Sequence, residues 1–118
     1  MNDLIPSEVN PRDLNDWLKE SSSTSPILVD VREKEELAIA PFPYSVIHLP
    51  LSEHSLWFST YSINLTFESP VVVICHSGIR SLNFGIWLLE QDDRYQVWNL
   101  QGGIDAWSLE VDSSISRY

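Results

Sequence analysis

The segment from Val71 to Ser81, which reads VVVICHSGIRS, constrains the fold more than any other part of this chain. Its β-branched run predicts a buried strand that leads directly into Cys75, the only cysteine. A short loop with Gly78 and Arg80 follows, and Ser81 is placed to open a helix. This strand–Cys–loop–helix order puts a sulfur atom among free backbone N–H groups at a helix N-terminus. Because such an environment stabilises an anion, the sequence predicts a reactive thiolate or a bound oxyanion here.

The composition is that of one globular domain without disulfides. Of the 118 residues, 43% are hydrophobic and 20% are charged, which is enough to build a single core. A lone cysteine cannot form an internal disulfide, and the polar start MNDLIPSEVN lacks the pattern of a secretory signal. We therefore expect a cytoplasmic protein. The formal charge of −10 disfavours nucleic acid and anionic membranes as partners, and the oligomeric state stays open.

Predicted strands and helices alternate along the chain. Apolar runs predict strands at Ile27–Val31, Val46–Leu49, Val71–Cys75 and Gln96–Leu100. Helical spacing and capping residues predict helices at 11–20 with Asn10 as N-cap, at 33–40, at Ser52–Ser59 with Ser52 as cap, at Ser81–Gln91 and at Ile104–Leu109. Loops are expected at 21–25, 41–44 and 60–69. This alternation predicts an α/β fold with a mainly parallel sheet covered by helices on both faces.

Three sequence features are expected to meet at one edge of this sheet. Ligand sites in parallel sheets lie beyond the carboxyl ends of the strands. Cys75 ends one predicted strand, Asp30 lies near the end of a second, and the turn at 101–103 follows a third. The candidate site is therefore placed at this edge. Gly85, inside the helix that follows the cysteine loop, indicates close packing of that helix against a neighbour.

Four motifs, in this order, are similar to those of the single-domain rhodanese family, a family of sulfurtransferase-type modules. They are VDVREKEEL at 29–37, IHLPL at 47–51, CHSGIRS at 75–81 and NLQGGIDAW at 99–107. The resemblance covers residues 7–118, with 1–6 as an N-terminal tail, and implies a rhodanese-like three-layer domain. One departure is PFPYSVIH, where many rhodaneses carry a Gly-His-Ile-Pro-Gly-Ala-like segment, so a rebuilt turn is expected there. The ending VDSSISRY is similar to rhodanese domains attached to enzymes that activate ubiquitin-like sulfur carriers.

The resemblance implies a sulfurtransferase whose catalytic nucleophile is Cys75. In the family a thiolate attacks the outer sulfur of a donor such as thiosulfate and becomes a persulfide. Cyanide, a thiol or a protein then removes that sulfur. Because the chain has no second cysteine, the acceptor must be external. No metal or organic cofactor is implied. The alternative for Cys75 is a buried structural cysteine, which would be inert.

The same resemblance assigns substrate binding to the loop residues His76, Ser77, Gly78, Ile79, Arg80 and Ser81. Arg80 offers a fixed positive charge for an oxyanion such as sulfite, or instead forms a salt bridge with a neighbouring carboxylate. The Ser77 and Ser81 hydroxyls bond the sulfur or cap the helix, and capping alone would explain Ser81. Asp30 and Arg32 stand where the family places an acidic–basic pair. Asp30 either holds the loop backbone or Arg80, or forms a structural ion pair.

Two other classes of function are alternatives to sulfur transfer. Cysteine-dependent phosphatases and arsenate reductases use a related loop, but phosphatases place five residues between Cys and Arg and this chain has four. Phosphatases also usually carry His before the cysteine, where Ile74 stands here. The other alternative is a non-catalytic interaction module, although such modules often lack the cysteine. A relay that hands the persulfide to a protein, in cofactor or tRNA thiolation, remains a variant of the sulfurtransferase hypothesis.

Overall fold

A five-stranded parallel sheet forms the centre of the structure, a computed structural model that describes residues 4–20, 25–54 and 65–118. The strand order is β1-β5-β4-β2-β3, and every neighbouring pair is parallel. The strands are β1 (Ser7–Val9), β2 (Ile27–Asp30), β3 (Ile47–His48), β4 (Val71–Ile74) and β5 (Val97–Leu100). The parallel sheet predicted from the alternation of elements is confirmed.

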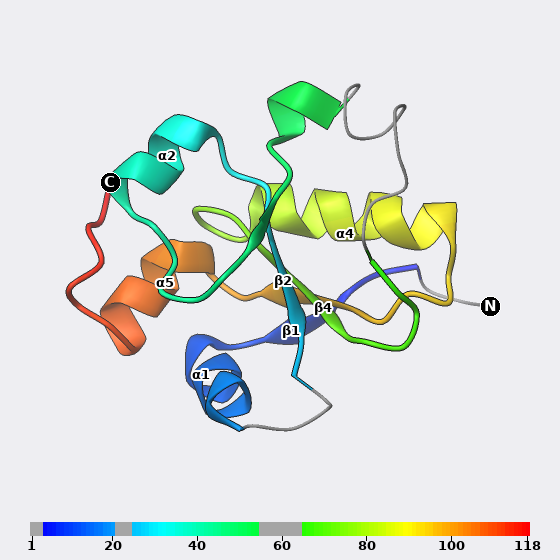
Figure 1. Cartoon of the computed structure of the whole chain (residues 1–118), viewed down its shortest axis with the longest axis horizontal. Helices are drawn as coiled ribbons and strands as arrows, with labels where there is room; N and C mark the ends of the chain where they lie inside the picture. Colours follow the sequence, from blue (N-terminus) through cyan, green and yellow to red (C-terminus); the bar gives the residue numbers. More distant parts are fainter. Residues whose placement is uncertain (1–3, 21–24, 55–64) are drawn as a thin grey trace.

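Helices cover both faces of the sheet, as Figure 1 shows. Within the described residues they are α1 (Pro11–Lys19), α2 (Lys34–Ile39), the 3₁₀ helix η1 (Leu51–Glu53), α4 (Ile79–Gln91) and α5 (Gly103–Glu110). Helix α4 packs on one face, and α1 and α5 pack on the other. The predicted three-layer α/β fold is therefore confirmed. None of the helices within the described ranges is long and apolar enough to cross a membrane.

Strand β4 lies in the middle of the sheet and sends side chains into both layers. Val71 and Val73 join the apolar cluster beneath α4, and Cys75 continues the same alternation just after the strand. Val72 and Ile74 join the cluster formed with α1 and α5. All four strand residues are fully buried, which explains their β-branched composition. The alternation therefore directs the Cys75 side chain toward the α4 face.

The start of α1 and the packing of Gly85 follow the sequence predictions. The Asn10 side chain accepts a hydrogen bond of 2.8 Å from the backbone N–H of Asp13, as an N-cap does. An added Cβ at Gly85 would lie 2.5 Å from the Pro6 ring and 3.1 Å from a methyl group of Val97. The absence of a side chain at Gly85 thus lets α4 approach β5 and the segment that precedes β1.

One strand was not predicted from the sequence, and the start of one helix differs from its prediction. Strand β1 was not predicted, because two of its three residues are exposed and show no apolar alternation; it forms by pairing with β5. The helix predicted at Ser52–Ser59 begins instead as η1 at Leu51, with Pro50 rather than Ser52 at the cap position. The Ser52 hydroxyl bonds the Glu33 side chain, so it is not available to cap η1. Residues 55–59 lie outside the described residues, as do 21–24 and 60–64 of two predicted loops.

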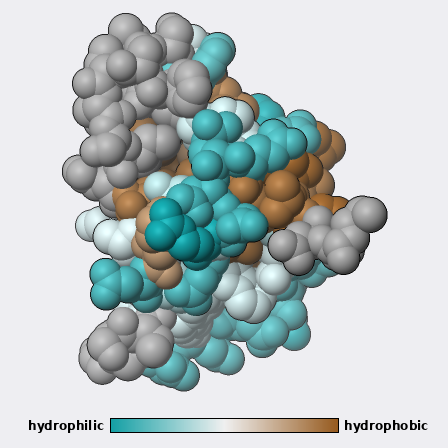
Figure 2. Space-filling view, turned by 90° about the vertical axis from the view of Figure 1, so that its right-hand side faces the viewer, coloured by the Kyte–Doolittle hydropathy of each residue, from teal (hydrophilic) through white to brown (hydrophobic). Residues whose placement is uncertain are grey.

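The loop after β4 lies to the left of α4 in Figure 1. Figure 2 views the opposite end of the molecule, where α4 finishes, and its described surface mixes hydrophilic and hydrophobic residues. The strand ends that the sequence predicts to carry the site are therefore on the far side of Figure 2.

Candidate active site

The Cys75 sulfur lies at the base of a tight loop and accepts two hydrogen bonds. The backbone N–H of Gly78 donates at 3.0 Å and the hydroxyl of Ser81 donates at 3.2 Å. The cysteine is 1% exposed. Two donors therefore converge on one sulfur, an arrangement that can stabilise negative charge on a sulfur atom held there.

Gly78 shapes the loop and stands at the N-cap of α4. Its φ of +98° lies in the left-handed region, and an added Cβ would lie 3.1 Å from the backbone nitrogen of Gly102. The predicted helix start at Ser81 was therefore wrong by two residues, and Ser81 lies inside α4 rather than at its cap. This position leaves the Ser81 hydroxyl available to the sulfur.

Asn99, at the end of β5, is a part of the site that the sequence analysis missed. Its amide nitrogen donates to the Gly78 carbonyl at 3.0 Å and to the Glu8 carboxylate at 3.2 Å. Its amide oxygen lies 2.5 Å from the Ser81 hydroxyl. Ser81 has one proton for two acceptors, so a protonated Cys75 leaves that proton with Asn99, and a thiolate draws it toward the sulfur. The motif NLQGG contained Asn99, but only the strand pairing places it beneath the loop.

The N-terminus of α5 supports the loop from the other side. Backbone N–H groups of Ile104 and Asp105 donate to the carbonyls of Cys75 and His76 at 2.9 and 3.0 Å. An added Cβ at Gly103 would collide with both carbonyl oxygens. The structure therefore joins the end of β4 to the turn after β5, as predicted from the positions of the strand ends.

Arg80 forms a bidentate salt bridge with Glu36 of α2, a residue that the sequence analysis did not assign to the site. Two guanidinium nitrogens donate to the two carboxylate oxygens, each at 2.8 Å. Hydrogen bonding to Arg80 lowers the pKa of Glu36 to about 2 despite partial burial. The pKa of Arg80 is raised, chiefly by Glu36, and the nearby Cys75 sulfur adds to this shift. Arg80 thus lies within electrostatic reach of Cys75 but is already paired.

Asp30 and Arg32 form a second ion pair, and it is completely buried. Both side chains are 0% exposed, and the Arg32 Nη2–Asp30 Oδ2 distance is 2.8 Å. Arg32 also donates to the Ala40 carbonyl at 2.9 Å, and its own carbonyl oxygen lies 2.6 Å from Nε2 of His48. The suggestion that Asp30 holds Arg80 was wrong, because Glu36 occupies that role and Asp30 pairs with Arg32.

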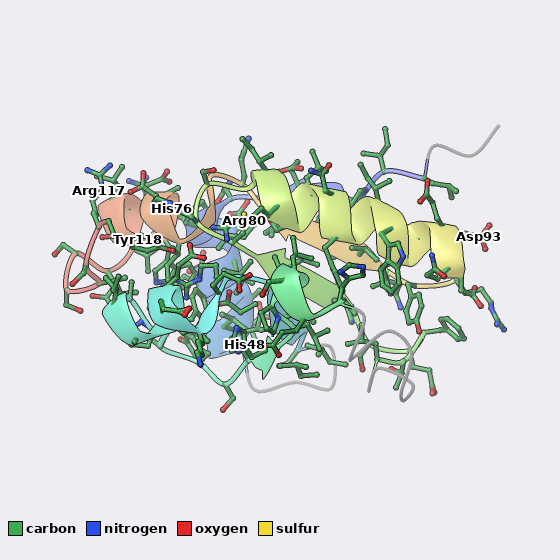
Figure 3. All side chains as sticks on the ribbon, turned by 90° about the horizontal axis from the view of Figure 1, so that it is seen from above. His48, His76, Arg80, Asp93, Arg117 and Tyr118 are labelled. Carbon is green, nitrogen blue, oxygen red and sulfur yellow. The ribbon has the colours of Figure 1, made fainter. Side chains whose placement is uncertain are left out.

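Tyr118 connects the two ion pairs and covers His76. Its hydroxyl accepts from Arg32 at 3.1 Å and donates to Glu36 at 2.9 Å. Its ring stacks on the His76 imidazole, with the two centroids 4.1 Å apart. In Figure 3, His76, Arg80 and Tyr118 lie near one another beside the start of α4. No feature of the sequence indicated this contact.

Ser77 and Ile79, the remaining loop residues, face solvent, and Ile79 is 67% exposed. The six predicted substrate-binding residues thus occupy the loop after β4 and the first turn of α4, and their roles in binding stay predictions. Among the described residues, no group of three or more His, Cys, Asp or Glu side chains is placed to hold a metal ion.

Comparison with known proteins identifies the family of this fold. The family model for the rhodanese-like domain matches residues 13–110. The chain belongs to the rhodanese-like domain family. A rhodanese-related protein of Thermoplasma volcanium has a similar structure, with a TM-score of 0.66 and 26% identity over 89% of this chain and 93% of that one.

Two relatives illustrate how this rhodanese-like domain occurs in other proteins. The thiosulfate sulfurtransferase GlpE of Haemophilus influenzae is 29% identical over 110 residues, which cover 91% of this chain and 95% of that protein. The chloroplastic rhodanese-like/PpiC domain-containing protein 12 of Arabidopsis thaliana is 38% identical over 91 residues, which cover 77% of this chain and 30% of that protein. The rhodanese-like chain therefore spans about a third of the plant relative but nearly all of the bacterial one.

Proposed function

We propose that this protein transfers sulfane sulfur through a persulfide on Cys75. The Cys75 thiolate attacks the outer sulfur of a small donor such as thiosulfate, the donor's S–S bond breaks, and sulfite leaves with the bonding pair. An external nucleophile such as cyanide, a thiol or a protein thiol then attacks the outer sulfur of the persulfide and regenerates the thiolate. No oxidant and no cofactor is needed, because sulfane sulfur is transferred in both steps and one bond to it breaks as another forms.

The observation that carries this proposal is the pair of hydrogen bonds to Cys75 Sγ from the Gly78 amide and the Ser81 hydroxyl. The atom that these two donors contact would become the inner sulfur of the persulfide, so they would hold the sulfur chain at the base of the loop. Support also comes from sulfurtransferase relatives. One is the adenylyltransferase and sulfurtransferase of Debaryomyces hansenii, which is 27% identical over 93% of this chain and 25% of that protein. That relative makes a protein acceptor a natural variant of the proposal.

Mass spectrometry of the treated protein tests this proposal directly. After incubation with a sulfane-sulfur donor and removal of the excess, we expect the peptide that contains Cys75 to carry one added sulfur atom. Cyanide should remove that atom and form thiocyanate in equal amount. A folded protein that takes up no sulfur from thiosulfate, from a thiosulfonate or from a small persulfide would contradict the proposal.

Replacing Arg80 by alanine should weaken the use of anionic donors. The change removes the guanidinium and leaves the Glu36 carboxylate unpaired beside the loop, so we expect kcat/KM for thiosulfate to fall by about tenfold or more. Steady-state kinetics with thiosulfate and cyanide measure this fall. Arg94→Ala is the matched control, because Arg94 pairs with Asp92 just after α4, away from the loop. Unchanged kinetics in Arg80→Ala would show that Arg80 is a structural residue only.

A further inference from the structure

The positive charge of Arg80 is fully engaged by Glu36. Both terminal nitrogens of the guanidinium point at the two oxygens of one carboxylate, so the fork that would bind an oxyanion is already occupied. The Arg80 side chain is 36% exposed and the Glu36 side chain 17%. The pair therefore forms part of the accessible rim of the loop and presents no net charge to an incoming donor.

Glu36 is held in this position by groups other than Arg80. It is the N3 residue of α2, and its carboxylate accepts a hydrogen bond of 2.9 Å from the backbone N–H of Glu33 in a capping box. The Tyr118 hydroxyl donates to the other carboxylate oxygen at 2.9 Å. Because these contacts fix the carboxylate, it does not simply turn away when an anion approaches Arg80.

The second arginine near the loop is compensated as well. Arg32 is fully buried against Asp30, so its charge is cancelled within the pair and cannot contact a donor. The whole chain carries a formal charge of −10. A thiolate at Cys75 would therefore add a negative charge beside two ion pairs that carry no net charge. Among the described residues, the donors that contact its sulfur are a backbone N–H and a hydroxyl.

We infer that Glu36 sets donor specificity by neutralising Arg80, so that the site uses sulfane-sulfur donors with at most one negative charge, such as persulfides of neutral thiols, in preference to dianionic thiosulfate. This inference rests on the proposed function. In the favoured reaction the Cys75 thiolate attacks the outer sulfur of R–S–SH, and a new S–S bond forms. The S–S bond of the donor breaks and R–S⁻ leaves with the electron pair. One sulfur atom has moved, and neither partner is oxidised overall.

The test compares two donors that differ by one charge. Thiosulfate is a dianion that releases sulfite, whereas methanethiosulfonate is a monoanion that releases methanesulfinate. The variant Glu36→Gln removes the negative charge and one of the two acceptor atoms. Its amide oxygen can still accept from the Arg80 guanidinium and the Glu33 N–H, and its amide nitrogen can donate to the Tyr118 hydroxyl. We expect kcat/KM to rise about tenfold for thiosulfate and about threefold for methanethiosulfonate, because the interaction energy scales with the charge of the donor. Loss of fold would instead lower both values.

Glu35→Gln is the matched control, because it removes the same charge from an exposed residue of the same helix. This substitution should change kcat/KM by no more than about twofold for either donor, since exposed charges are screened. A second measurement needs no variant: added salt should raise the parent protein's kcat/KM for thiosulfate relative to methanethiosulfonate, because it screens a repulsion. The inference would be overturned if Glu36→Gln raised kcat/KM by the same factor for both donors. It would also be overturned if added salt lowered the parent protein's kcat/KM for thiosulfate relative to methanethiosulfonate. Failure of every donor to load Cys75 would instead overturn the proposed function.

Discussion

The variant Cys75→Ser should lose sulfur transfer and keep its fold. We expect the rate of thiocyanate formation to fall by about a thousandfold or more, to the background rate, because a hydroxyl is a poor nucleophile toward sulfane sulfur and forms no persulfide. The fold should persist, since the serine oxygen can accept the same hydrogen bonds from Gly78 and Ser81. Mass spectrometry should detect no added sulfur on the variant.

Two controls make the Cys75→Ser result specific. Circular dichroism and thermal unfolding establish that the variant is folded, because the substituted side chain is buried and lies in the cluster beneath α4. Asn99→Asp offers a milder perturbation of the same network, since it replaces the amide that bonds the Gly78 carbonyl with a group that cannot donate when ionised. Retention of full sulfur transfer in Cys75→Ser would remove the basis of the mechanism.

Replacing Arg32 by methionine should destabilise the protein by about 3–5 kcal/mol, because it leaves the Asp30 carboxylate buried without its partner. The methionine side chain retains much of the packing volume, so the loss reports mainly the uncompensated charge. Chemical denaturation at neutral pH measures the free energy of unfolding. The double variant Asp30→Asn with Arg32→Met should recover part of that loss, because it removes the orphaned charge.

Arg94→Met serves as the matched control for Arg32→Met. Arg94 forms the same kind of pair with Asp92, but its side chain is 68% exposed, and such surface pairs contribute little. We therefore expect the midpoint of denaturation to remain that of the parent protein. If the two substitutions lowered the free energy of unfolding equally, the buried pair would contribute no more to stability than the exposed pair.

The parts of the fold that could be predicted from the sequence are those governed by neighbouring residues. The β-branched run at 71–74 predicted β4, because a strand buried on both faces needs no polar alternation. Asn10 followed by proline predicted the start of α1 through a cap that spans three residues. Strand β1 lacked any such local signal, and its pairing partner β5 lies about 90 residues away along the chain.

The candidate site likewise contains residues that are close together in the sequence and residues that only long-range contacts bring to it. The sequence placed Cys75, Gly78 and Arg80 on one loop, because their spacing is a local property. It did not reveal Glu36 as the partner of Arg80, since 44 residues separate them and the docking of α2 decides whether they meet. Asn99, 18 residues from Ser81, entered the site by the same kind of long-range contact.

On its own, then, the order of residues determined the alternating elements, the α/β architecture and a candidate nucleophile at the end of a central strand. Periodicity, capping and turn chemistry act over a few residues, so they can be inferred without knowledge of the rest of the chain. Only the tertiary structure decided the charge around that nucleophile, because the pairing of Arg80 with Glu36 and the bridging by Tyr118 depend on how distant elements pack. The loop carries the cysteine on which the proposed sulfur transfer depends, and the packing of α2 brings Glu36 against Arg80 beside it.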